Sequence, residues 1–265
     1  MGHHIQMHSR PGVELETGPP ADAAWGYLPA TSFRSRRSAL SDAQRATWER
    51  RWPDLGRQGV AQDAPSGTAR PLDTAAWFGR DAPLVLEIGC GSGTSTLAMA
   101  QAEPGIDVIA VEIYRRGLAQ LLCAIDDAEV GNIRLIRGNG VDVLKCQIAP
   151  DSLTGVRIFF PDPWPKARHH KRRLLQSGTV ALIADRLVTG GVLHAATDHP
   201  GYAEHSAAVG DAEPKLTRVT QPTSSDTGNQ TLPISVGRPA TKYETKARKA
   251  GSPVSEFVWR KHETG

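Results

Sequence analysis

A proline-rich turn at residues 161–165 carries the side chains best suited to chemistry. The sequence PDPWPK places a carboxylate, an indole and an ammonium group, on Asp162, Trp164 and Lys166, within five positions. Three prolines in five residues neither continue a strand nor form an ordinary helix interior, so they fix a rigid, extended turn. We expect this turn to form a reaction centre, with Asp162 as its acid. Trp164 is either a stacking face for a base or a wedge that packs the turn.

A cationic run follows this turn directly. Two more basic blocks occur at residues 34–37 and 242–249, in a chain whose formal net charge is only +3. Three separate blocks indicate positive charge concentrated on part of the surface, which is typical of nucleic-acid binding. A solvated helix start is the alternative interpretation of the run alone. The run consists of Arg168, His169, His170, Lys171, Arg172 and Arg173.

A glycine-rich turn, Gly89-x-Gly91-x-Gly93, follows the apolar segment LVLEI. Glycines between a strand and a helix let the backbone approach a ligand closely. The spacing differs from the GxGxxG fingerprint of dinucleotide sites, and the turn lacks the Gly-Lys-Ser/Thr ending of a phosphate-binding loop. The loop therefore predicts a nucleoside-like ligand without a pyrophosphate.

Polar side chains end the neighbouring predicted strands. Glu87 and Glu112 end the first two strands and Asn139 follows the third, while Asp162 and Asp198 follow the fourth and fifth. Ligands of open α/β sheets bind outside the carboxyl ends of the strands, where an acid can hold a ribose diol. Carboxylates repel phosphates but suit S-adenosylmethionine, which carries a sulfonium and an ammonium group. The alternative for Glu112 is an exposed acid without a ligand.

Hydrophobic periodicity predicts the elements that position these residues. Apolar runs predict strands, and apolar residues at helical spacing predict helices between them. Alternation of strand and helix is typical of an α/β fold with a parallel, doubly wound sheet. The predicted strands are 84–88, 108–111, 133–137, 156–160, 192–196 and 255–261, and the predicted helices are 40–52, 73–78, 94–101, 116–126, 142–148, 174–188 and 202–209.

Composition places the chain among globular proteins with one main domain. It has 265 residues, of which 39% are hydrophobic. We expect a disordered tail over 1–30, a basic arm with helices over 31–80 and the main domain over 81–265. Three cysteines without CxxC spacing predict no disulfide framework and no metal site, as in a reducing cytoplasm. No apolar run is long enough for a membrane span, and no signal segment is evident.

Four segments together resemble the bacterial tRNA (guanine-N7-)-methyltransferase family: EIGCGSG, VEIYRRGLAQLL, FPDPWPKARHHKRRL and TKYETKARKAG. The resemblance covers roughly residues 31–261, and its proline–tryptophan motif is the most specific part. It implies a Rossmann-like class I methyltransferase with a mostly parallel, seven-stranded sheet and an N-terminal helical extension. It also implies transfer of a methyl group from S-adenosylmethionine to N7 of guanosine 46 in the variable loop of tRNA.

The resemblance also assigns roles to residues. Cofactor binding is expected at Glu87, Glu112, Asn139 and Asp162 together with the glycine turn, and Asp162 matches the position proposed as catalytic. RNA contacts are expected along 168–173. Substrate contacts are expected at Lys166, Asp198, Thr241, Lys242, Tyr243 and Glu244.

Other functions stay open at this point. A methyltransferase acting on another RNA, a small molecule or a protein would keep the cofactor site without needing the basic blocks. A non-catalytic RNA-binding module would keep the blocks without the cofactor. The long tail and the polar segment 221–239 depart from the family pattern, and monomeric and homodimeric forms are both compatible with the sequence.

Overall fold

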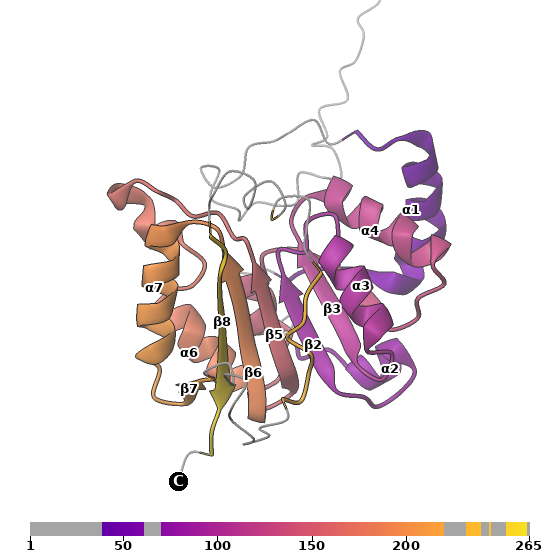
Figure 1. The fold of residues 1–265 in the computed structure, drawn as a ribbon. Helices are drawn as coiled ribbons and strands as arrows, with labels where there is room; N and C mark the ends of the chain where they lie inside the picture. Colours follow the sequence, from indigo (N-terminus) through magenta and orange to yellow (C-terminus); the bar gives the residue numbers. More distant parts are fainter. Residues whose placement is uncertain (1–38, 61–69, 220–231, 240–243, 245–252, 264–265) are drawn as a thin grey trace, which may run out of the picture. The chain divides into compact units, whose positions relative to one another are not determined.

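The computed structural model describes residues 39–60, 70–219, 232–239, 244 and 253–263. These residues belong to one compact unit, in which helices flank a central sheet (Figure 1). Among them, no helix is both long and apolar enough to span a bilayer. The elements are α1 (Asp42–Leu55), β1 (Gly56–Gln58), α2 (Thr74–Phe78), β2 (Leu84–Ile88), α3 (Thr94–Ala102), β3 (Asp107–Glu112), α4 (Arg115–Asp127), β4 (Ile133–Arg137), α5 (Gly140–Cys146), β5 (Leu153–Phe159), η2 (Ala167–Arg172), α6 (Ser177–Arg186), β6 (Leu187–Thr197), α7 (Pro200–Asp211), β7 (Leu216–Arg218) and β8 (Ser255–Lys261).

The sheet confirms the predicted α/β class. In the described residues its strand order is β1-β4-β3-β2-β5-β6-β8-β7. Every pairing from β1 to β6 is parallel, and only β8 runs antiparallel to its neighbours β6 and β7. The part of the chain that the structure describes has eight strands rather than seven, because the short strand β1 adds to the edge of β4, with Gly56 in register with Leu135.

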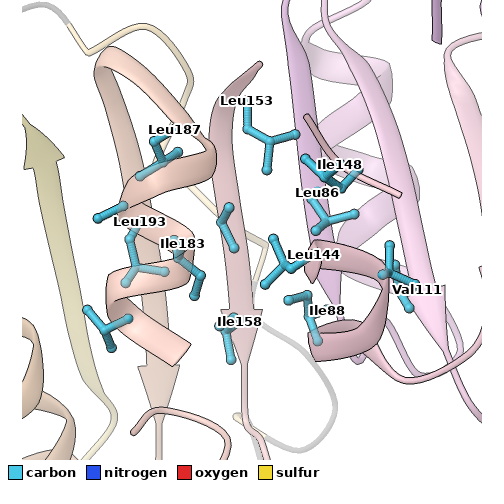
Figure 2. Close-up of a cluster of buried hydrophobic side chains, with 14 of the residues drawn as sticks. Leu86, Ile88, Val111, Leu144, Ile148, Leu153, Ile158, Ile183, Leu187 and Leu193 are labelled. Carbon is cyan, nitrogen blue, oxygen red and sulfur yellow. The ribbon is translucent and has the colours of Figure 1, made fainter. Parts of the chain in front are cut away.

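Alternating side chains of the strands form one core layer on each face. The first layer holds Leu86 and Ile88 against α5 and α6, including Leu144 and Ile183 (Figure 2). The second layer, which includes Val85, lies against α1, α3 and α4. Burial on both faces explains why the sequence of β2 is continuously apolar apart from its one acid.

Helix α4 illustrates how the predicted periodicity becomes packing. Its residues Leu118, Leu121, Leu122 and Ile125 are all fully buried, as their spacing predicted. Burial of each such side chain contributes about 1.5–3 kcal/mol relative to its exposed state. Helix α4 is thereby fixed next to the glycine turn.

Residues 232–239, here called the strap, lie on the second face of the sheet in front of β2 and β5 (Figure 1). They form no helix or strand, but they are not a solvated polar loop. Ile234 is 3% exposed and packs on Gly155. A β-carbon on Gly155 would lie only 2.4 Å from the Cδ1 atom of Ile234. Arg157 donates from Nη2 to the Ser235 carbonyl at 3.3 Å. The strap therefore takes the place of a covering helix.

The boundary between α6 and β6 differs from the prediction. We expected a helix to Val188 and a strand from Val192, whereas α6 ends at Arg186 and β6 begins at Leu187. The register with β5 shifts between these first residues and Val192, and Gly190 has a φ of 82°. The glycine pair therefore forms a bulge inside the strand instead of ending the helix.

Helix α1 also runs further than predicted. We expected Trp52-Pro53 to end it, but it continues to Leu55 with Pro53 inside its last turn. Leu55 is buried in the second core layer, and this burial offsets the one backbone hydrogen bond that a proline cannot make. The helix ends where the Gly56 amide donates to the Trp52 carbonyl. The three-part division of the chain stays a prediction.

Candidate functional site

The carboxyl ends of the central strands meet at one edge of the sheet. Ile88 of β2 is in register with Val111 of β3 and with Ile158 of β5. Phe159 of β5 is in turn in register with Ala196 of β6. The loops that follow these strands, which carry the predicted site residues, therefore begin at a common level.

A cavity of about 390 Å³ opens at this edge. Its volume lies in the range of pockets for small ligands and cofactors. It brings together three predicted regions: the glycine turn, the proline-rich turn and the end of β6. Residues of its wall include Glu87, Gly89, Gly91, Phe159, Phe160 and Asp198.

The glycine turn forms one wall of the cavity. Gly93 has a φ of 73°, and a β-carbon there would lie 2.4 Å from the Leu121 side chain. Gly117 lets α4 approach, because a β-carbon on it would lie 2.3 Å from the Gly91 carbonyl oxygen. Open space surrounds the α-carbons of Gly89 and Gly91 on the side where a β-carbon would lie. The turn thus leaves bare backbone at Gly89 and Gly91, and its contact with a ligand stays a prediction.

Glu112 holds the glycine turn from the end of β3. Its Oε2 accepts from the Gly91 amide at 2.9 Å, and its Oε1 accepts from the amides of Ile113 at 2.7 Å and Tyr114 at 3.1 Å. Oε1 already accepts two hydrogen bonds, whereas Oε2 accepts one and can accept a second, so a ligand hydroxyl can join the Gly91 amide at Oε2.

Asn139 lies at the N-terminus of α5. Its Oδ1 accepts from the Val141 amide at 2.9 Å and caps the helix. This cap uses the acceptor end of the side chain and leaves its NH₂ group able to donate. The residue is therefore both a helix cap and a candidate contact for a ligand.

Glu87 is the most perturbed acid of the cavity. It is 3% exposed, and burial raises its pKa to about 7, although the Arg157 guanidinium and then the Thr96 hydroxyl act in the opposite direction. Its Oε2 has no hydrogen-bond partner among the described residues. A buried carboxylate oxygen without a partner at a cavity wall indicates a ligand that brings a cation or a hydrogen-bond donor.

The proline-rich turn closes the opposite side of the cavity. Phe160 and Trp164 both have positive φ angles, of 52° and 44°, which non-glycine residues seldom adopt. Pro161 and Pro163 line the cavity, and Asp162 between them is exposed. Backbone strain of this kind is typical of functional sites.

Trp164 packs against the guanidinium of one residue and the imidazole ring of another. The Arg172 guanidinium lies 5.1 Å from the centre of its ring, and His169 contacts it edge-on at 5.7 Å. Loss of hydration and neighbouring cations lower the pKa of His169. The structure thus supports the packing role of Trp164, one of the two interpretations of its sequence.

The basic run forms the 3₁₀ helix η2 beside this turn. Arg168 and Lys171 are exposed, while His170 is half-buried. Arg173 differs, because it is 5% exposed and donates to the carbonyls of Pro163 at 3.0 Å and Gly201 at 3.1 Å. Its guanidinium therefore braces the turn, and its burial differs from the exposure expected of an RNA contact.

The predicted substrate residues lie at different places. Asp198 lines the cavity at the end of β6, next to His199, which caps α7. Lys166 is exposed at the start of η2. Glu244 is buried, and its Oε2 accepts from Arg238 Nη1 at 2.5 Å. Residues 241–243 lie outside the described residues, as do the basic residues of 34–37 and 242–249.

Three buried basic side chains of the second face were missed from the sequence. Arg157 of β5 is in register with His194 of β6, and both are fully buried. Arg238 of the strap is 3% exposed at its side chain. One sequence signal was available for Arg157 and His194. Each interrupts an apolar strand, and because side chains of a strand alternate between the two faces of the sheet, both occupy positions that face the same side.

Comparison with known proteins identifies relatives along nearly the whole chain. Residues 81–257 match the model of a family described as "Putative methyltransferase". A tRNA (guanine-N(7)-)-methyltransferase of Mycobacterium tuberculosis is 68% identical over 266 residues, covering 99% of this chain and 96% of the relative. One from Mycobacterium ulcerans is 64% identical over 282 residues, covering 98% and 99%.

Similarity to solved structures is more distant. A 30S ribosomal A1408 methyltransferase from an uncultured bacterium has a TM-score of 0.47 and 11% identity, covering 72% of this chain and 95% of that one. An rRNA methylase from Streptococcus thermophilus has a TM-score of 0.45 and 16% identity, covering 73% and 98%.

Proposed function

Since the chain belongs to the tRNA (guanine-N(7)-)-methyltransferase family, we propose that it transfers a methyl group from S-adenosylmethionine to N7 of guanosine 46 in tRNA. The observation that carries the proposal is identity of 64% or more to these relatives across nearly all of both chains. The shared edge of glycine turn, acids and proline-rich turn supports it. The three cysteines, free in the structure, suit a cytoplasmic enzyme.

The cavity suits S-adenosylmethionine. The partnerless oxygen of Glu87 would accept from a cationic group, and the bare backbone at Gly89 and Gly91 would lie against the ligand. Glu112 would accept from ribose hydroxyls and Asn139 would donate to the adenine edge. When bound, S-adenosylmethionine supplies an electrophilic methyl group on a positively charged sulfur.

The protein's task is positioning rather than proton removal. Guanine N7 carries a lone pair and no proton, so no general base is required to begin the attack. The rigid turn would hold Asp162 beside the purine and orient it. Because positive charge develops on the purine, the Asp162 carboxylate would stabilise the transition state.

Base recognition falls to two further acids. Guanine presents the donors N1–H and N2–H₂, which Asp198 of the cavity wall and Glu244 can accept. Lys166 would contact a phosphate or the base. Phosphate contacts contribute affinity without reading sequence, and the exposed cations Arg168 and Lys171 are placed to provide them.

Mass analysis of tRNA nucleosides tests the proposal. Purified protein, tRNA that lacks the modification and S-adenosylmethionine should yield 7-methylguanosine, and a tRNA with adenosine at position 46 should yield none. Methylation of a small molecule alone, or S-adenosylmethionine binding absent in calorimetry, would overturn the proposal in favour of another substrate or a non-catalytic module.

A further inference from the structure

Arg238 of the strap is buried among aromatic and acidic side chains, although it belongs to a segment without helix or strand. Its side chain is 3% exposed, and its guanidinium lies over the rings of Phe159 and Phe160, at 5.6 Å and 5.0 Å from their centres. Both rings line the cavity. A cation over two aromatic faces gains electrostatic energy from both, provided that its planar group stays in place.

The same guanidinium is paired with two acids. Nη1 donates to Glu244 Oε2 at 2.5 Å, and Nε lies 3.5 Å from Glu256 Oε1. Glu256 is also bonded by His194 Nε2 at 2.5 Å. Burial, as the main cause, lowers the pKa of His194, so the ring is neutral near pH 7 and donates as an N–H group. Arg238 thus pairs with both carboxylates.

Buried ion pairs of this kind are costly to form, and replacing both partners by apolar residues is often neutral or stabilising. Stability alone therefore gives a weak reason for this arrangement. What it does provide is geometry: it fixes the Glu244 carboxylate relative to the two rings at the cavity. Glu244 is one of the two acids, with Asp198, to which the proposed function assigns the guanine edge.

We propose that Arg238, whose guanidinium lies over Phe159 and Phe160, is a positioning residue for base recognition, which holds the Glu244 carboxylate and so sets the preference for guanine over a purine without its 2-amino group. This inference rests on the proposed function, and it concerns a residue outside the predicted cofactor and substrate contacts. Arg238 touches neither the methyl group nor N7 and acts through Glu244.

The test compares tRNA transcripts that carry guanosine or inosine at the target position. Inosine keeps N7 and N1–H but lacks the 2-amino group. A hydrogen bond to a charged acceptor gives the wild-type protein an expected preference for guanosine of about 10- to 100-fold in kcat/KM. In Arg238→Lys we expect this ratio to fall to within about threefold of one, because an ammonium cannot reproduce the planar contacts.

Arg218→Lys is the matched control. Arg218 also lies over two rings, Phe257 at 5.2 Å and Trp259 at 5.7 Å, and pairs with Asp211 at 2.6 Å, but it is on β7 away from the cavity wall. We expect it to keep the wild-type ratio. Both variants should bind S-adenosylmethionine with a Kd within about twofold of wild type, by calorimetry.

The outcomes separate the inference from the proposed function. No methylation of the guanosine transcript by wild type refutes the proposed function. Wild-type methylation with an unchanged guanosine-to-inosine ratio in Arg238→Lys, or an equal loss of rate on both transcripts, refutes the inference. Should Arg238→Lys not fold, the variant Arg238→Met/Glu244→Gln removes the pair together, and a wild-type ratio in that protein also refutes it.

Discussion

Binding of S-adenosylmethionine should depend on pH through Glu87. Burial raises the pKa of this carboxyl to about 7 in the free protein. A cationic ligand beside it favours the ionised form, so binding should release the proton. We therefore expect affinity to fall as the pH falls below 7, and Glu87→Gln to abolish this dependence.

The pKa of Glu87 sets how strongly the apparent Kd for S-adenosylmethionine changes with pH. At pH 6 only about one tenth of the free protein carries an ionised Glu87, so the apparent Kd should be about tenfold higher than at pH 8. Glu87→Gln should weaken binding at pH 8 by about 10- to 100-fold, since it removes a charged acceptor. The unliganded protein should also lose stability as the pH rises from 4.5 to 7. In this range Glu87 is ionised in the unfolded chain but still protonated in the folded protein, so a rising pH favours unfolding.

Calorimetry in buffers of different ionisation enthalpy measures both the Kd and the protons released. The control is Asp107→Asn. Asp107 is also a buried acid, 2% exposed, and it pairs with Arg80, but it is the first residue of β3 and so lies at the end of that strand away from the cavity. It should keep the wild-type pH profile. A flat wild-type profile, or an unchanged slope in Glu87→Gln, would refute the reasoning.

Three further predictions concern the turns and the basic surface. Asp162→Ala should lower kcat at least about 100-fold while leaving the melting temperature intact, and near-wild-type turnover would remove Asp162 from the mechanism. Reversing the charges of Arg168 and Lys171 to Glu should raise KM for tRNA and flatten its salt dependence, and unchanged turnover on tRNA would contradict the RNA surface. Gly93→Ala should destabilise the fold by about 1–3 kcal/mol in denaturant unfolding, because of its positive φ and the nearby leucine, whereas a change below about 0.5 kcal/mol would show that α4 yields at this position.

The rim of the site could be predicted because its signals are local. Apolar runs ending in an acid or a proline locate strand ends, and parallel strands end at one edge. This is why the structure brings Glu87, the glycine turn and Asp198 to one cavity. Asp162 lies in the same turn as two lining prolines for the same reason.

The buried charges could not be predicted because their partners are distant in the chain. Arg157 pairs with Glu103, 54 positions away, and His194 contacts Glu256, 62 positions away. No local pattern shows that an arginine in an apolar strand will meet an acid from elsewhere. The packing of the strap could not be predicted for the same reason, since its one buried apolar residue, Ile234, has no periodic neighbours.

The strap's anchors restrict where natural sequences can vary in length. Its contacts follow β5 in order, with Ile234 at Gly155 and Arg238 at Phe159. One residue more or fewer between these two points would shift the later contact by about 3.3 Å along the strand. Insertions and deletions among homologues should therefore fall outside residues 234–238, and the four-residue interval between the anchors should stay constant even where its side chains change.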